Sequence, residues 1–116
     1  MTDADIAEES FLLLENDICF IGHTHSPGVF AKTKEGRIVY RADPEFRLAD
    51  NEKYIVNVGS VGQPRDGDPA ACYCVYDSAK NTVEIKRVKY DCQAAAGKIL
   101  AAGLPRFLAE RLLVGR

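Results

Sequence analysis

The sequence predicts an α/β fold with helices at both ends and mostly antiparallel strands between them. Three observations support this prediction. Residues 3–16 have apolar side chains at helical spacing, residues 18–21 are a short continuous apolar run, and alternating segments from residue 29 onward are separated by turn-forming residues. The length of 116 residues fits one small domain, residues 1–116.

The opening segment, residues 3–16, is expected to be a helix. Ala7, Phe11 and Leu14 recur at i, i+4 and i+7, and acidic residues crowd the first turns. The apolar run at residues 18–21 follows directly and is expected to be a strand buried on both faces. A helix leading into such a strand is the second half of a crossover unit, whose first strand does not occur in the sequence.

Further strands are expected at residues 29–33, 37–41, 54–58, 71–76 and 82–90, and residues 42–50 are expected to be a loop in which 46–48 could form one edge strand. Gly36 marks the turn of one hairpin, and residues 78–81 connect another. Pro44 restricts residues 46–48 to an edge strand. The tail predicts a helix over residues 93–102, which Gly103 ends, and a second helix in which Pro105 is the first residue and Leu113 the last.

Composition excludes several classes of function. Fifteen Lys and Arg against seventeen Asp and Glu give a formal charge of −2, so the chain has no overall attraction to nucleic acid or anionic membrane. Lys86, Arg87 and Lys89 form either a local basic patch or the solvated edge of a strand. The apolar runs are far shorter than the ~20 residues of a membrane-spanning helix. The acidic N-terminus is not a targeting segment, which indicates a cytoplasmic protein.

The four cysteines form no C-x-x-C pair, which favours buried free thiols in a reducing compartment. They are Cys19, Cys72, Cys74 and Cys92.

The loop after the first strand, Gly22 to Pro27, contains the only two histidines. In an extended segment residues i and i+2 face the same way, so His23 and His25 could converge on one metal ion. They could equally be exposed or hydrogen-bonded, because zinc sites use three or four protein ligands. Cys72 and Cys74 have the same i, i+2 spacing, so the two histidines and two cysteines could together form one zinc site. Alternatively, the two cysteines are thiols packed in the core.

A second loop, residues 57–69, is rich in Gly and Pro. Gly59, Gly62 and Gly67 permit positive φ, and the N–H groups of such loops can form anion-binding nests. Arg65 could contact a phosphate. Alternatively the loop is a structural turn in which Asp66 or Asp68 pairs with Arg65. Neither a P-loop nor a dinucleotide-binding pattern occurs.

The Gly22-His23-Thr24-His25 motif (GHTH) and the Asn57-Val58-Gly59-Ser60 loop together resemble calcineurin-like metallophosphoesterases, especially small bacterial and archaeal phosphoesterases. The resemblance implies the C-terminal half of a four-layer α/β/β/α sandwich. It also implies a phosphatase-type hydrolase that uses two divalent metal ions (Mn, Fe, Zn or Ni) to cleave small phosphomono- or phosphodiesters. His23 and His25 would be metal ligands, and Gly22, Thr24, Asn57, Gly59 and Ser60 would support their loop.

The remaining ligand motifs of that family do not occur in this sequence. They are Asp-x-His, Gly-Asp-x-x-Asp, Gly-Asn-His-Asp/Glu and one further histidine. Because two divalent ions need carboxylate ligands between them, we expect the isolated chain to bind metal weakly or not at all and to be inactive. The alternatives are a non-catalytic module that forms at least a homodimer, or a subunit completed by a separate N-terminal half.

Overall fold

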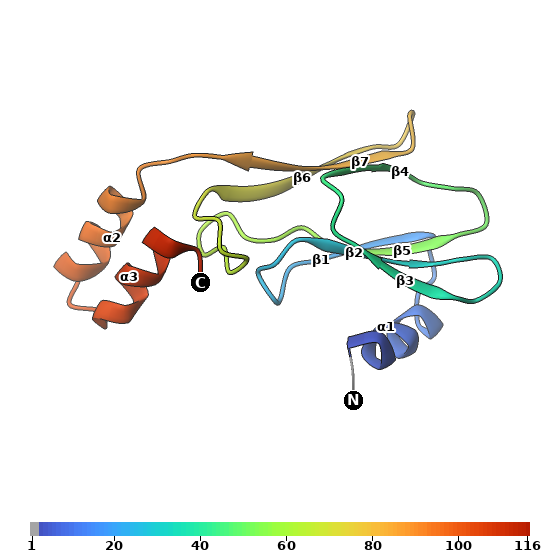
Figure 1. The fold of residues 1–116 in the computed structure, drawn as a ribbon, viewed down its shortest axis with the longest axis horizontal. Helices are drawn as coiled ribbons and strands as arrows, with labels where there is room; N and C mark the ends of the chain where they lie inside the picture. The colour runs from blue at the N-terminus through green and yellow to red at the C-terminus, as the bar shows by residue number, and fades with distance from the viewer. Residues whose placement is uncertain (1–2) are drawn as a thin grey trace.

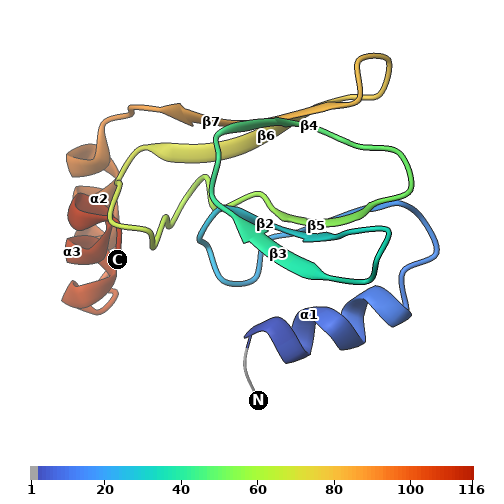
Figure 2. The same ribbon diagram turned by 45° about the vertical axis from the view of Figure 1, so that its right-hand side comes forward.

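The computed structural model describes residues 3–116, with side chains from residue 5 onward. A helix, a four-stranded sheet and a three-stranded sheet lie in successive layers, and a pair of helices stands at one end (Figures 1 and 2). The elements are α1 (Asp3–Leu12), β1 (Ile18–Ile21), β2 (Gly28–Lys32), β3 (Ile38–Arg41), β4 (Glu45–Arg47), β5 (Lys53–Asn57), β6 (Ala71–Asp77), β7 (Thr82–Val88), α2 (Cys92–Ala101) and α3 (Arg106–Val114). The expected α/β fold class, with helices at both ends, is confirmed.

The first sheet has the strand order β1-β5-β2-β3, and the second has the order β4-β7-β6. The pair β1–β5 is parallel, and every other pair in the described chain is antiparallel. Both expected hairpins form, as β2–β3 and β6–β7. The parallel pair brings the carboxyl ends of β1 and β5 to the same edge of the first sheet, so the loops that follow these two strands lie next to each other.

The core lies between the two sheets. Val29 and Val56 of the first sheet pack against Phe46 and Val83 of the second, and Val56 and Val83 are fully buried. On the other face of the first sheet, α1 packs its apolar residues, among them Phe11, against β5 and its neighbours. The α2–α3 pair packs mainly on itself, and Gly67 N–H donates to Gly115 O at 2.8 Å. This bond anchors the C-terminal end to the loop before β6.

Three local expectations are wrong. The strand β1 is not buried on both faces, because it is an edge strand with one neighbour, and Phe20 and Ile21 are 41% and 42% exposed. The strand β7 is not a solvated edge but the central strand of its sheet. Pro105 precedes α3 as its N-cap and is not its first helical residue.

The four cysteines are free, as expected, but the expectation that they are buried holds only for Cys72, and Cys19, Cys74 and Cys92 are half-buried. The opening helix is shorter than expected, since α1 ends at Leu12. None of the described helices is long and apolar enough to cross a membrane.

Candidate functional site

The two loops singled out by the sequence lie side by side because β1 and β5 are parallel neighbours. Ile21 and Asn57, the last residues of these strands, are partners in the register, and Val58 N–H donates to Ile21 O at 2.8 Å. We call residues 22–27 the histidine loop and residues 58–69 the glycine loop. The carboxyl ends of parallel strands are where α/β proteins commonly place binding sites.

The histidine loop is a turn, so the expectation of an extended segment is wrong. His25 N–H donates to Gly22 O at 3.1 Å, and His25 has a φ of 60°, in the left-handed region. That conformation costs a non-glycine residue about 1 kcal/mol. Contacts with the glycine loop offset the cost. The half-buried His25 ring donates from Nδ1 to Gln63 O at 2.8 Å, and Arg65 N–H donates to His25 O at 3.1 Å.

Asn57 connects the two loops through its side chain. Its Nδ2 donates to Thr24 Oγ1 at 2.7 Å, and its Oδ1 accepts from Gly59 N–H at 3.0 Å. The residue is 9% exposed. A buried amide with both ends hydrogen-bonded has one orientation, so Asn57 fixes the histidine loop relative to the glycine loop.

The glycine loop has a turn of its own at Ser60. The Ser60 hydroxyl accepts from Gln63 N–H at 2.9 Å, and Ser60 O accepts from Cys72 N–H at 3.0 Å. This turn aims the Gln63 carbonyl at His25. The Gln63 side chain also accepts a hydrogen bond from Arg65 Nε at 3.0 Å. Arg65 is exposed, and this bond holds its guanidinium beside the loop.

Gly59 is the position where only glycine fits. Its φ is +75°, and a Cβ there would lie 2.6 Å from Cys72 Sγ and 3.0 Å from Cys72 Cβ. Gly22 has no such requirement, since its nearest neighbour would be Gly59 O at an ordinary 3.7 Å. Burial beneath this loop raises the pKa of the Cys72 thiol.

Arg87 of β7, not Arg65, is the partner of the loop's carboxylates, so the expected pairing of Arg65 is wrong. Arg87 Nη1 lies 2.7 Å from Asp66 Oδ2, and Arg87 Nε lies 3.4 Å from Asp68 Oδ2. Arg87 Nη2 also donates to Asp68 O at 2.8 Å and to Ala70 O at 2.9 Å. Burial lowers the pKa of Arg87, but the hydrogen bond and charge of Asp66 outweigh it, so the pKa lies above its ordinary value.

Sequence reasoning missed Arg87 and Gln63 as determinants of this loop. The two aspartates of the loop signalled the need for a cation, but nothing in the sequence showed that it comes from β7. Gln63 acts on His25 through its backbone carbonyl, for which a side chain gives no signal.

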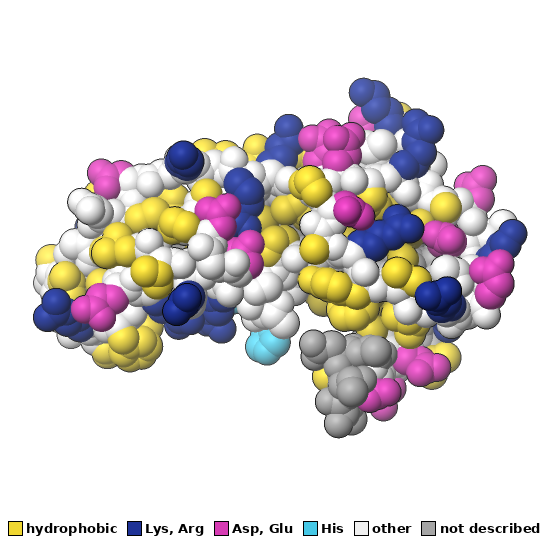
Figure 3. All heavy atoms as spheres, viewed as in Figure 1, with side chains coloured by type: hydrophobic (Ala, Val, Ile, Leu, Met, Phe, Trp, Pro, Cys, Tyr) yellow, Lys and Arg dark blue, Asp and Glu magenta, His cyan; other side chains and the backbone are white. Residues whose placement is uncertain are grey.

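A cleft of about 850 Å³ opens between α1 and the histidine loop. Ile6, Phe30 and Ile55 contribute to its apolar walls, and His23, Thr24 and Asn57 form part of its polar end. Figure 3 shows a histidine side chain exposed where this face of the molecule is indented. His23 is exposed, and its side chain makes no hydrogen bond to any described residue.

Within residues 5–116, no three His, Cys, Asp or Glu side chains form a group that could hold a metal ion. The alternative zinc site that joins the two histidines with Cys72 and Cys74 is therefore not formed. The bond from His25 Nδ1 to the Gln63 carbonyl leaves Nε2 of the neutral ring with its lone pair. The donor set thus fits part of a metal site.

Comparison with known proteins gives two informative relatives. No family model matches the sequence. The chain is 43% identical over 100 residues to an uncharacterized protein of Methanocaldococcus jannaschii, a match that covers 86% of this chain and 40% of that protein. The crystal structure of a metallophosphoesterase from Sphaerobacter thermophilus is similar with a TM-score of 0.87 and 33% identity. That match covers all of this chain and 49% of the neighbour's chain.

The chain therefore spans half or less of the proteins that it matches. The likeness in structure extends over both sheets and all the helices, since the whole chain is aligned. The resemblance that the two loops indicate is confirmed, and this chain has the fold of about half of a metallophosphoesterase, consistent with the C-terminal half.

Proposed function

We propose that this chain supplies part of the metal site of a phosphoesterase, with His23 and His25 as ligands. The observation that carries the proposal is the hydrogen bond from His25 Nδ1 to Gln63 O. A metal-binding histidine commonly donates its other ring nitrogen to a carbonyl, which fixes the tautomer and the direction of the lone pair. His23 lies in the same turn with an unbonded ring at the cleft.

The remaining ligands come from the other half of the fold. Two divalent ions, of Mn, Fe, Zn or Ni, carry four positive charges, and two neutral imidazoles offset none of them. Carboxylates are needed to hold such a pair. When bound, the ions supply Lewis-acid activation of a small phosphoester. The isolated chain is accordingly inactive in this proposal.

The surrounding residues hold the ligands in place. The Asn57 side chain is hydrogen-bonded to both Thr24 and Gly59, Ser60 shapes the turn that presents the Gln63 carbonyl, and Gly22 closes the histidine turn. Arg65 is exposed beside this turn and carries a guanidinium that can make a two-pronged contact with a phosphoester. The positions of these side chains relative to His25 support these roles.

The test is metal binding by the isolated chain, combined with activity of a completed enzyme. Manganese added to the isolated chain should broaden the imidazole NMR signals of His23 and His25, with weak affinity, and turnover of bis-p-nitrophenyl phosphate should stay at background. In a chimera, these 116 residues replace the matched segment of the Sphaerobacter thermophilus enzyme. There, His23→Ala and His25→Ala should each lower kcat by about 100-fold or more.

A matched control is Lys34→Ala in the chimera, because Lys34 is exposed in the turn between β2 and β3, away from the cleft. Its activity should equal that of the parent chimera. Turnover by the isolated chain would contradict the proposal, as would histidine variants that keep the parent kcat. Manganese that leaves both imidazole signals sharp would also contradict it, whether or not the chimera folds.

A further inference from the structure

The two long sides of the sandwich are built differently. One side is formed by the edge strands β3 and β4, and the other by the edge strands β1 and β6. The rings of Phe20 on β1 and Tyr76 on β6 have centroids 5.6 Å apart, so these two edges meet. We call the side formed by β1 and β6 the open side and the side formed by β3 and β4 the closed side.

The closed side carries the features that protect sheet edges. Arg41 pairs with the inward-facing Val29, so a charged residue points inward at this edge. The strand β4 has only three residues, and its central residue Phe46 is buried between the charged Glu45 and Arg47. Short strands and inward charges discourage further strand pairing.

The open side has interior-facing aromatic residues whose side chains remain partly exposed to solvent. Phe20 is the register partner of Val56 and faces the interior with it, yet Phe20 is 41% exposed while Val56 is fully buried. Tyr76 is the partner of the fully buried Val83 and is 40% exposed. The strand β1 has no charged residue, and β6 has only its last residue, Asp77. The core is therefore open along this side.

The backbone of β6 also offers hydrogen-bonding groups on the open side. Cys72 N–H points away from β7, because it donates to Ser60 O at 3.0 Å. Along an antiparallel strand, the N–H groups of successive residues point alternately toward and away from the same neighbouring strand. The N–H groups of Cys74 and Tyr76 therefore point the same way as that of Cys72. In the part of the chain that the structure describes, no strand pairs with β1 or β6 there.

We propose that the open side is the docking surface for a polypeptide that carries the other half of a metallophosphoesterase fold. The partner adds a strand to β1 and another to β6, and its apolar side chains cover Phe20 and Tyr76. The choice of partner follows from the Sphaerobacter thermophilus enzyme, of which this chain matches 49% with its whole length. The identity of the partner rests on the proposed function, whereas the location of the docking surface follows from the exposed edges alone.

Hydrogen exchange tests the surface in the chimera described above, compared with the isolated chain. Amides of β1 and β6 should exchange about tenfold or more slowly in the chimera than in the isolated chain, whereas those of β3 and β4 should be unchanged. Unchanged exchange at β1 and β6, in a chimera whose β2 and β5 amides are protected, overturns the proposal. So does protection of β1 and β6 in the isolated chain that disappears on dilution, because a second copy then covers the open side.

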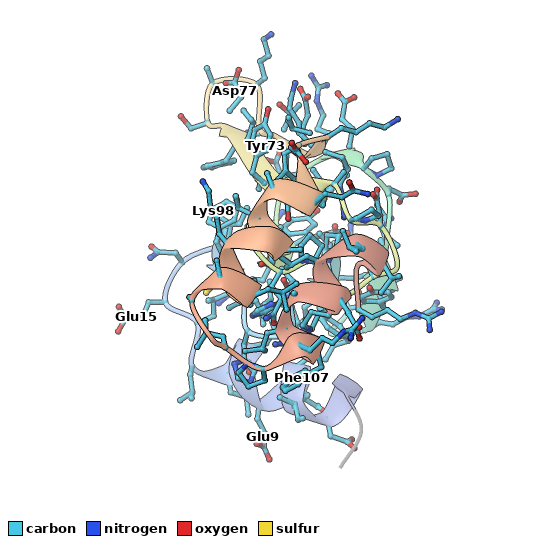
Figure 4. The ribbon with its side chains drawn as sticks, turned by 90° about the vertical axis from the view of Figure 1, so that its left-hand side faces the viewer. Glu9, Glu15, Tyr73, Asp77, Lys98 and Phe107 are labelled. Atoms are coloured by element: carbon cyan, nitrogen blue, oxygen red, sulfur yellow. The ribbon has the colours of Figure 1, made fainter. Side chains whose placement is uncertain are left out.

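A capture experiment does not depend on the chimera. The tagged chain is co-produced with the unmatched part of the Sphaerobacter thermophilus enzyme as a separate polypeptide. Phe20→Lys should lower the captured amount about tenfold, because a charge buried among apolar side chains is costly. Phe107→Lys is the matched control, since Phe107 is a 60% exposed aromatic on α3 (Figure 4), and α3 lies at one end of the molecule (Figure 1). Failure of the wild-type chain to capture the partner overturns the proposal, as does equal capture by both variants.

Docking and catalysis can fail separately in these experiments. Protected edges in a chimera without activity would contradict the metal site and leave the docking surface intact. Activity in a chimera whose edges remain unprotected would contradict the docking surface alone.

Discussion

The region of the two loops and the open side of the sandwich are organised in opposite ways. In the loop region, the side chains of Asn57, Ser60 and His25 are all hydrogen-bonded. Gly59 packs against Cys72 and leaves no space for a methyl group. On the open side, Phe20 and Tyr76 face the interior but remain about 40% exposed. The chain fixes the geometry of His25 by itself, although its core is exposed along one side.

In the proposed function, this difference gives the two halves of the fold separate tasks. A site whose ligands are held in place before binding needs no reorganisation when the remaining ligands arrive. An exposed apolar edge instead gains its stability only when it is covered. We therefore expect substitutions in the loop region to destabilise the isolated chain strongly and substitutions on the open side to affect mainly docking.

The largest effect is expected for Gly59→Ala. The new methyl group would overlap Cys72 Sγ, and alanine is disfavoured at a φ of +75°. We expect the free energy of unfolding, measured by urea denaturation, to fall by about 3 kcal/mol. Gly62→Ala is the control, because nothing lies within 4 Å of its added Cβ. Equal stability of the two variants would show that the loop region is not tightly packed.

A smaller loss is expected for Arg87→Met. It removes the ion pair with Asp66 and the hydrogen bonds to the carbonyls of Asp68 and Ala70, while keeping a side chain of similar length. We expect the free energy of unfolding to fall by about 2 kcal/mol. Arg65→Met, which loses only the contact with Gln63, should change it by less than about 0.5 kcal/mol. The reverse order would mean that Arg65, not Arg87, holds the glycine loop.

Most of the fold was predictable because its strands carry local signals. The hairpins β2–β3 and β6–β7 have alternating side chains on either side of turn residues, a pattern that depends only on neighbours in sequence. The position of β1 at a sheet edge was not predictable. Its four apolar residues are typical of a strand covered on both faces, yet β1 lies at the edge of its sheet, where Phe20 and Ile21 are 41% and 42% exposed.

The positions of the two loops were predictable, and their geometry was less so. The two motifs located both loops, and the parallel pairing of β1 with β5 brings them together. The turn at His25 was not predictable, because its left-handed backbone is stabilised by the carbonyl of Gln63, 38 residues away. Arg87 was predicted as part of a strand edge, because its contacts with Asp66 and Asp68 come from tertiary structure.

The smallest effect is a pH dependence that reports how well the loop region excludes water. Burial raises the pKa of Cys72 above its ordinary value of 9.0, so the unfolded chain loses this proton first as the pH rises. The stability that this thiol contributes is therefore complete below about pH 9 and is lost as the pH rises through the higher folded-state pKa.

The free energy of unfolding should therefore fall as the pH rises above about 9, and it should fall less steeply in Cys72→Ala. Some slope will remain in the variant, because burial also raises the pKa of Cys74 and of Tyr54. The variant is less stable at every pH because it leaves a cavity below Gly59, so the comparison uses the slopes alone. Identical slopes would mean that water reaches Cys72 in the folded chain, and the loop region would then be as loosely covered as the open side.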